Sequence, residues 1–193
     1  MGAFARSVVL LGFALAPGTA HAHFVPGDPD SGRTVYLLPG PLVSLVVPFS
    51  SDRPPMLMDV GVEVSVFRFV PTSRRFWSQC GYGALAQAQL GGVQVQAGDT
   101  PAPSLHLRLA LGAEATFGPL GAHAGLLTRV FTGDHAGMLG AFAGVFLTFG
   151  LATASFQIEL PFAQVGDGLD QPIAFASTIT LKWPITLAEL RPR

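Results

Sequence analysis

The sequence predicts an all-β protein, an eight-stranded antiparallel transmembrane up-and-down β-barrel, and three observations favour this class. Apolar and polar residues alternate through most of the chain between Met56 and Ile185, with the period of two that is typical of strands in a two-faced sheet. Charged residues make up 12% of the chain, against about 25% in ordinary soluble domains. The alternating region also follows a segment with the composition of an export signal.

That N-terminal segment has three recognisable parts. Arg6 supplies a positive charge, residues 8–16 form a short apolar core, and Ala20-His21-Ala22 is an A-x-A cleavage motif. The apolar core is too short to cross a membrane as a helix. We expect the chain to divide into a signal peptide over residues 1–22, a periplasmic lead-in over residues 23–41, a barrel over residues 42–187 and a short periplasmic tail over residues 188–193.

The first three expected strands are each long enough to cross a bilayer, which takes about ten residues in a tilted strand. The first lies in the second half of residues 34–49, after the interruption at Pro39-Gly40-Pro41. The second, residues 56–70, sets valines on one face against acidic and small residues on the other. The third, residues 76–90, sets alanines against glycine and glutamine.

The remaining five strands repeat the same alternation with other residues. The fourth sets four leucines against His106 and Arg108, and the fifth has a weaker pattern. The sixth sets aliphatic residues against glycine and threonine, while the seventh and eighth set aromatic and aliphatic residues against Thr, Ser, Gln, Glu and Lys. Their expected ranges are residues 105–117, 122–131, 139–149, 152–162 and 173–185.

The connections between these strands differ in length according to their side of the barrel. Two of the three even-numbered connections, residues 118–121 and a tight turn near Gly150, are shorter than every odd-numbered one. Outer-membrane barrels have short periplasmic turns and longer outside loops, so both termini are expected in the periplasm. The odd-numbered connections are residues 50–55, 98–104, 132–137 and 165–172.

The composition of the polar face indicates which face is wet. It holds Gly, Gln, Ser and Thr with isolated charges, as a narrow lumen requires, whereas a water-facing exterior would be rich in Lys and Glu. A soluble lipocalin-like barrel with its apolar face inward is the alternative. We expect a lumen charge network of Glu63, Arg108, Glu114, Glu159 and Lys182, with Arg129 as a further candidate. We expect interfacial aromatic residues at Phe76, Trp77, Phe117, Phe131, Phe149 and Trp183.

Eight strands enclose a lumen that side chains can fill, so we expect a structural or surface barrel without catalysis. A narrow ion or small-solute pore is one alternative. A lipid A-modifying enzyme is another, for which the candidate residues are His106, His123, Ser155 and Glu159. A catalytic set needs its nucleophile and base within hydrogen-bond reach, and the sequence holds no local signature of such a set.

Metal binding and nucleic-acid binding have little support in the sequence. Cleavage after Ala22 would leave His23 at the N-terminus, where its amine and ring could bind copper in a periplasmic protein, but no further ligand motif follows. Gly-Asp pairs in three outer loops, such as Gly98-Asp99, read as turn residues, although an acidic rim could bind divalent cations and lipopolysaccharide. No metal or cofactor is expected, and a net charge of −1 without a basic run gives no sign of nucleic-acid binding.

The signal peptide, the eight alternating strands and the polar lumen together resemble the small bacterial outer-membrane barrels of the OmpA and OmpX type. The resemblance is one of pattern over residues 42–187. It implies an outer-membrane location, a monomer, contact with outer-membrane lipids and lipopolysaccharide, and insertion by the outer-membrane barrel assembly machinery. Such barrels end on an aromatic residue that this machinery recognises; here Trp183 takes that role, or the tail after Leu187 is an addition.

Overall fold

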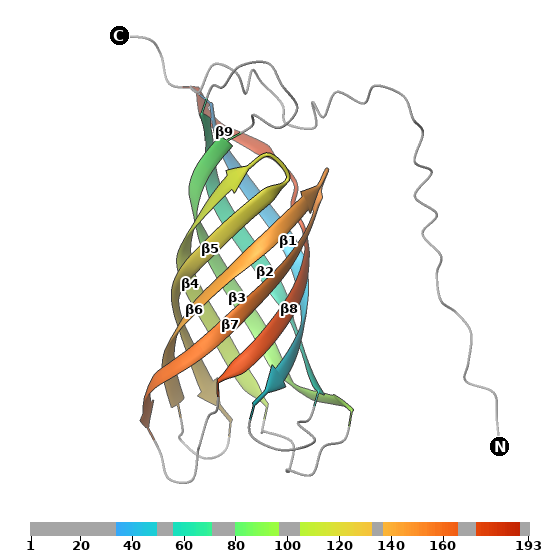
Figure 1. Cartoon of the computed structure of the whole chain (residues 1–193), viewed down its shortest axis with the longest axis vertical. Coiled ribbons are helices and arrows are strands. Elements are labelled where there is room, and N and C mark those ends of the chain that lie inside the picture. Colours follow the sequence, from blue (N-terminus) through green and yellow to red (C-terminus); the bar gives the residue numbers. More distant parts are fainter. Residues whose placement is uncertain are drawn as a thin grey trace, which may run out of the picture.

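The computed structural model describes residues 34–49, 56–70, 80–96, 105–132, 137–165 and 173–189, which form nine strands (Figure 1). No helix among these residues is long and apolar enough to cross a bilayer. The strands are β1 (Thr34–Pro48), β2 (Met56–Val70), β3 (Cys80–Gln96), β4 (His106–Phe117), β5 (Leu120–Phe131), β6 (Gly137–Phe149), β7 (Ala152–Val165), β8 (Ala174–Leu181) and β9 (Ile185–Glu189).

The strands close into a barrel in which every observed pairing is antiparallel. Each strand from β2 to β7 pairs with the next one along the chain, and β1 closes the sheet by pairing with β2 on one edge and with β8 and β9 on the other. Strands β8 and β9 occupy successive stretches of the same edge of β1, so the nine strands make an eight-stranded wall. The predicted all-β, eight-stranded, up-and-down architecture is therefore confirmed.

The two ends of the barrel differ in their connections. Tight turns join β4 to β5 at Gly118-Pro119 and β6 to β7 at Gly150-Leu151, and Gly118 and Gly150 have φ values of 62° and 63°. The first residue of each two-residue turn has a left-handed backbone conformation, which glycine adopts more readily than other residues. We call this the turn end; β1 begins and β9 ends there as well (Figure 1). The opposite end, where β1 ends and β2 begins, is the loop end.

The first strand begins earlier than the sequence predicted. We expected residues 23–41 to lead into a strand after Pro41, but β1 runs from Thr34 through both prolines, with Pro39 opposite Val64 and Pro41 opposite Val62. Residues two apart in a strand direct their backbone groups to the same edge. Both prolines therefore direct their missing N–H toward the β8–β9 edge, where the ladder is interrupted, and the β2 edge stays bonded.

The last strand is interrupted where we expected it to be continuous. Residues 173–185 were predicted as one strand, but β8 ends at Leu181 and β9 begins at Ile185, because Pro184 cannot donate to a ladder. Strand β9 then continues to Glu189, so part of the expected tail belongs to the wall. Residues 1–33, including the expected signal peptide and His23, lie outside the described residues.

Strand β3 extends past its predicted end at Leu90 because it contains a bulge. Met58 pairs with Val93 and Val60 pairs with Leu90, so Gly91 and Gly92 together oppose the single residue Asp59. Gly92 has a φ of 100°, which a residue with a side chain rarely adopts. The bulge continues the strand to Gln96 and brings the Asp59 carboxylate over Gly91, because only a residue without a Cβ leaves room for it there.

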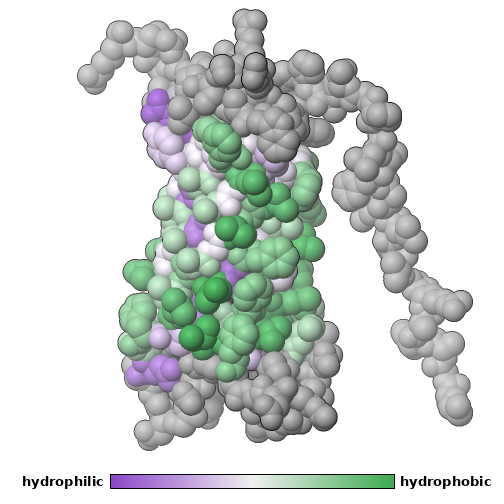
Figure 2. Space-filling view, viewed as in Figure 1, coloured by the Kyte–Doolittle hydropathy of each residue, from purple (hydrophilic) through white to green (hydrophobic). Residues whose placement is uncertain are grey.

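The outward-facing side chains of the wall are almost all apolar. Figure 2 shows a mainly apolar surface on the face of the barrel that is in view. Apart from Arg68, the charged side chains that the structure describes between residues 34 and 187 lie in the lumen. We call the outward surface the apolar belt. Members near the middle of their strands include Val60, Val62, Leu111, Leu126, Val145 and Ile179, which are 46–68% exposed.

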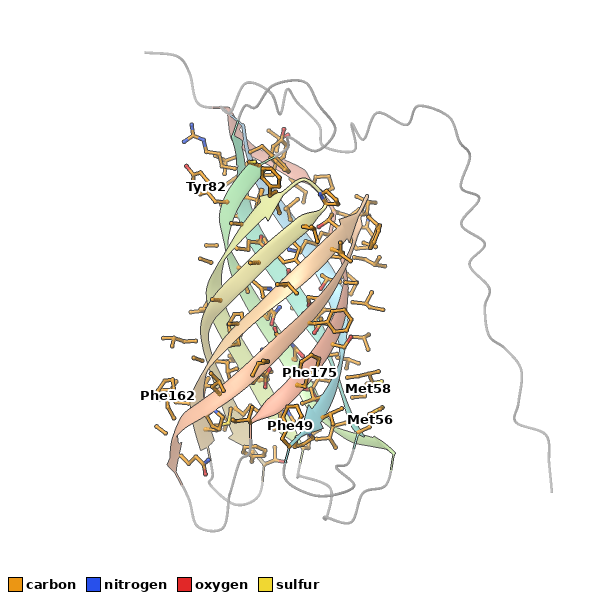
Figure 3. All side chains as sticks on the ribbon, in the orientation of Figure 1. Phe49, Met56, Met58, Tyr82, Phe162 and Phe175 are labelled. Atoms are coloured by element: carbon orange, nitrogen blue, oxygen red, sulfur yellow. The ribbon has the colours of Figure 1, made fainter. Side chains whose placement is uncertain are left out.

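Aromatic residues lie at both ends of the apolar belt, with one exception among those we predicted. Phe117 and Phe149 are exposed beside the tight turns, and Trp183 is exposed between β8 and β9. Phe131 is buried instead, because it shares the inward parity of Arg129 and packs on the ring of His106, 5.3 Å between centroids. Phe76 and Trp77 lie outside the described residues. Figure 3 shows Tyr82 at the turn end and Phe49 and Phe162 at the loop end.

Candidate functional site

The lumen holds most of the polar side chains of the described wall, and it forms the candidate site. Alternation along each strand directs every second residue inward, so charges from β2, β4, β5, β7 and the end of β8 meet there. Buried charges have to be paired or hydrogen-bonded to be tolerated. The structure arranges them in two clusters, which follow from the residues of each strand.

The first cluster centres on Glu159 of β7, which is 1% exposed. Its Oε1 accepts a hydrogen bond from Arg108 Nε at 2.9 Å, and its Oε2 accepts one from Arg129 Nη2. Gln157 Nε2 donates a third hydrogen bond to Oε1 at 3.0 Å. One carboxylate therefore links two guanidinium groups from the neighbouring strands β4 and β5, which would otherwise repel each other at directly opposed positions.

The second cluster centres on Lys182, which follows the end of β8. Its Nζ lies 2.6 Å from Glu63 Oε1 and 3.1 Å from Glu114 Oε2, and it donates to Ser65 Oγ at 3.0 Å. Thr180 Oγ1 lies 3.5 Å from Glu63 Oε2. These contacts connect the end of β8 with β2 and β4, so a single ammonium group crosslinks three parts of the wall.

Gln87 of β3 joins the two clusters. Its Nε2 donates to Glu63 Oε2 at 2.7 Å, and its Oε1 accepts from Arg108 Nη1 at 2.8 Å and from Gln89 Nε2 at 3.3 Å. An amide suits this position because it can donate to a carboxylate and accept from a guanidinium at the same time. The five residues predicted as a lumen charge network thus lie in one connected set of contacts, together with Arg129.

A third polar contact lies toward the loop end. Asp59 Oδ2 of β2 and His106 Nε2 of β4 are 3.4 Å apart, and both side chains are almost fully buried. The described lumen then holds three cations, Arg108, Arg129 and Lys182, and four carboxylates, Asp59, Glu63, Glu114 and Glu159. With both histidines counted as neutral, these groups sum to one excess negative charge.

Aromatic rings lying over glycines fill much of the remaining lumen. Phe142 is paired with Gly125 and Phe146 with Gly121 across β5 and β6. A Cβ on Gly125 would lie 2.8 Å from the Phe142 ring, and one on Gly121 would lie 2.2 Å from the Phe146 ring. The lumen is therefore less polar than we predicted. Leu85, Ala110, Leu127 and Met138 form one apolar cluster with Phe142, and Val46, Leu57, Ala174 and Ala176 form another.

The candidate catalytic residues do not come together as a set in the described structure. His106 contacts Asp59 and Phe131, whereas His123 packs against the rings of Phe142 and Phe146. Glu159 is occupied by two arginines. The described contacts of the two histidines include no hydroxyl or thiol group that could act as a nucleophile.

Metal binding receives no support from the described residues, among which no three His, Cys, Asp or Glu side chains are placed to share an ion. The candidate copper ligand His23 and the Gly-Asp pairs of the outer loops lie outside these residues. Cys80 is a free, half-buried thiol on the outward face beside Tyr82.

The sequence analysis did not select several polar residues of the lumen, among them Asp59 and Gln87. Asp59 and Gln87 both lie on the inward face of strands whose alternation was recognised, so parity alone could have selected them. We had selected charged residues only, and a glutamine gives no charge signal. The partner of Asp59 could not be inferred, because the pairing depends on the bulge at Gly91 and Gly92.

This chain has one weak structural match among known proteins. No family model matches the chain, and no curated protein matches it. Among solved structures, the chain is similar to Ail, the attachment invasion locus protein of Yersinia pestis, at 9% sequence identity and a TM-score of 0.22, over 79% of this chain and 99% of that one. A TM-score this low transfers no property of Ail to this chain, and the architecture rests on the strand pairing itself.

Proposed function

We propose that this protein is a structural or surface β-barrel of the bacterial outer membrane, closed to solutes by the side chains in its lumen and without catalytic activity. The observation that carries this proposal is the inverted polarity of the wall. Charged side chains are paired inside, as Lys182 with Glu63 and Arg108 with Glu159, while the apolar belt faces outward. A water-soluble barrel has the opposite arrangement.

The energetics of the apolar belt support a bilayer as its surroundings. Monomeric soluble proteins rarely expose a contiguous apolar patch larger than a few hundred Å², and here apolar side chains stand exposed on every strand of the wall. All backbone groups inside a bilayer have to be bonded within the protein, which a closed barrel achieves. Aromatic residues at both ends of the belt suit the two membrane interfaces.

The contents of the lumen support a closed barrel over a pore. Each cluster spans the interior. Glu159 of β7 pairs with arginines of β4 and β5, and Lys182 connects the end of β8 with β2 and β4. Eight strands leave only enough room for side chains. The isolated Asp59–His106 pair, with no nucleophile among its described contacts, supports a barrel that is not an enzyme.

The proposal places the protein in the envelope with specific partners. An N-terminal signal cleaved after Ala22 would export it, and the assembly machinery would insert it as a monomer with the turn end in the periplasm. Outer-membrane lipids would surround the apolar belt, and lipopolysaccharide would contact the loop end. The proposal includes no metal, cofactor or nucleic acid.

The first test is electrophoretic mobility of detergent-folded protein with and without boiling, together with fractionation of the expressing cells. A closed membrane barrel should migrate differently before and after boiling and should require detergent for extraction. Recovery as a soluble monomer from the aqueous periplasmic fraction would refute the membrane location, and copper titration of the N-terminus would then be the next experiment.

Two further measurements test the closed lumen and the absence of catalysis. Planar-bilayer recordings should give no steady open-state conductance, and a large stable conductance would establish the pore instead. Mass spectrometry of lipid A from expressing cells should match that from cells carrying an empty vector. A gained or lost acyl chain would establish a lipid A-modifying enzyme.

A further inference from the structure

The wall of the barrel is interrupted where β1 lies beside the junction of β8 and β9. The β1–β8 ladder runs from Pro48 to Leu42, and the β1–β9 ladder covers Thr34 to Leu37. Between them, residues 38–41 face residues 181–184, and the backbone contact observed there is the hydrogen bond from Trp183 N to Pro39 O at 2.9 Å. In Figure 1 this interruption is the thin segment joining β8 to β9.

Prolines on both sides account for the interruption. Pro39 and Pro41 have no backbone N–H to donate to the β8–β9 side, and Pro184 has no backbone N–H to donate to β1. The two backbones nevertheless touch, since a Cβ on Gly40 would lie 1.8 Å from the carbonyl oxygen of Leu181. The wall is therefore closed by contact where it lacks ladder bonds.

An open, shallow groove lies on the outer surface at this place. Its lining is formed by Pro39, Gly40, Pro41, Val62, Val64 and Trp183, together with Glu63. The Glu63 carboxylate turns inward to Lys182, 2.6 Å away, and the exposed surface of the groove is almost entirely apolar. We call it the Trp183 groove.

We propose that the Trp183 groove is a binding site for one acyl chain of a membrane lipid, held in preference to chains elsewhere on the apolar belt. The inference rests on the membrane-spanning barrel proposed above. Proline rings, β-branched valines and an indole have few rotatable bonds, so the groove is preformed and binding orders little of the protein. An acyl chain is apolar along its length and requires no hydrogen bond from the lining.

A peptide is a poor occupant of the same groove. An added strand would need N–H and C=O partners along this edge. Pro39 and Pro41 offer no N–H, and the Pro39 carbonyl already accepts from Trp183. The groove is also continuous with the apolar belt, since Val62 is 55% exposed and Trp183 is 48% exposed, so lipid chains would be the molecules that reach it.

Trp183 itself provides the measurement. The chain has two tryptophans, so Trp77→Phe leaves Trp183 as the only indole. Phosphatidylcholine with brominated acyl chains is titrated into this protein, folded in a mild detergent. Trp183 fluorescence should fall by more than half and saturate near one lipid per barrel.

As a control, a protein carrying Trp77→Phe, Trp183→Phe and Phe149→Trp has its indole on the outward face at the β6–β7 turn. Its quenching should be several-fold weaker, and equal quenching at the two positions would overturn the proposal.

A substitution that fills the groove provides a second arm. Val62→Phe should weaken the saturable quenching several-fold, whereas Val145→Phe, on the outward face of β6, should leave it unchanged. Quenching that persists in Val62→Phe would also overturn the site. The membrane proposal fails separately: a protein that is soluble without detergent and shows no heat-dependent mobility is not a membrane barrel, whatever its quenching.

Discussion

Lys182 Nζ lies 2.6 Å from Glu63 Oε1, and this pair ties the end of β8 to β2 across the intervening strand β1. The contact lies directly inside the interruption of the β1 ladder. The ion pair and its neighbour Glu114 therefore supply cross-wall contacts where backbone hydrogen bonds are missing. The stability of this part of the barrel should depend on side chains more than that of any continuously paired part of the described wall.

Lys182→Met should destabilise the barrel strongly. The substitution leaves two buried carboxylates, Glu63 and Glu114, without their cation, and breaking one side of a buried pair costs about 3–5 kcal/mol. Urea unfolding of vesicle-inserted protein, followed by gel mobility, measures the change. The triple variant with Glu63→Gln and Glu114→Gln should be closer to wild type. A loss below about 1 kcal/mol in the single variant, as for an exposed pair, would contradict the structural role of Lys182.

Gln87→Leu should disconnect the two charge clusters. It removes the acceptor of Arg108 Nη1 and the donor to Glu63 Oε2, and each unsatisfied buried group costs about 1–3 kcal/mol. The same unfolding assay measures the effect. The matched control is Ala88→Leu on the next, outward-facing position, which should change stability little. Equal effects of the two substitutions would show that the bridge contributes nothing.

Gly121→Ala should destabilise the barrel by overpacking, because the new Cβ would lie 2.2 Å from the Phe146 ring; such overpacking costs about 1–3 kcal/mol. The loss should be partly relieved by Phe146→Leu, giving a double variant more stable than the sum of the single effects. Gly150→Ala is the control: no atom lies within 4 Å of its Cβ position. Its cost of about 1–2 kcal/mol comes from the left-handed backbone and should not couple to Phe146→Leu.

Leu111→Arg tests the surroundings of the apolar belt. Leu111 is 68% exposed, so in water the substitution should alter stability by less than about 0.5 kcal/mol. On the lipid face it should cost up to about 2–4 kcal/mol, according to depth. Unfolding from vesicles measures the cost, and Leu111→Met serves as the control. An arginine that is tolerated as well as methionine would argue against a bilayer around this strand.

Much of the fold could be predicted because the inward and outward faces alternate residue by residue. The alternation in residues 56–70 and 105–117 is sufficient to place Glu63, Arg108 and Glu114 on one face, and a closed sheet then brings that face together. Breaks in the strands were harder to place. We expected the prolines to keep the first strand from beginning before Leu42. A strand tolerates a proline whose missing N–H would face an unpaired edge, and Pro39 lies in such a position.

The sequence by itself determined the alternation, the strand number and the set of lumen charges, because these depend only on local parity and on turn residues. Tertiary structure alone decided the partners, since Arg108 and Glu159 are 51 residues apart and Lys182 and Glu63 are further apart still. It also decided where the wall is interrupted. These features depend on the register between strands, which a local irregularity can shift, as the bulge at Gly91 and Gly92 does in the β2–β3 pair.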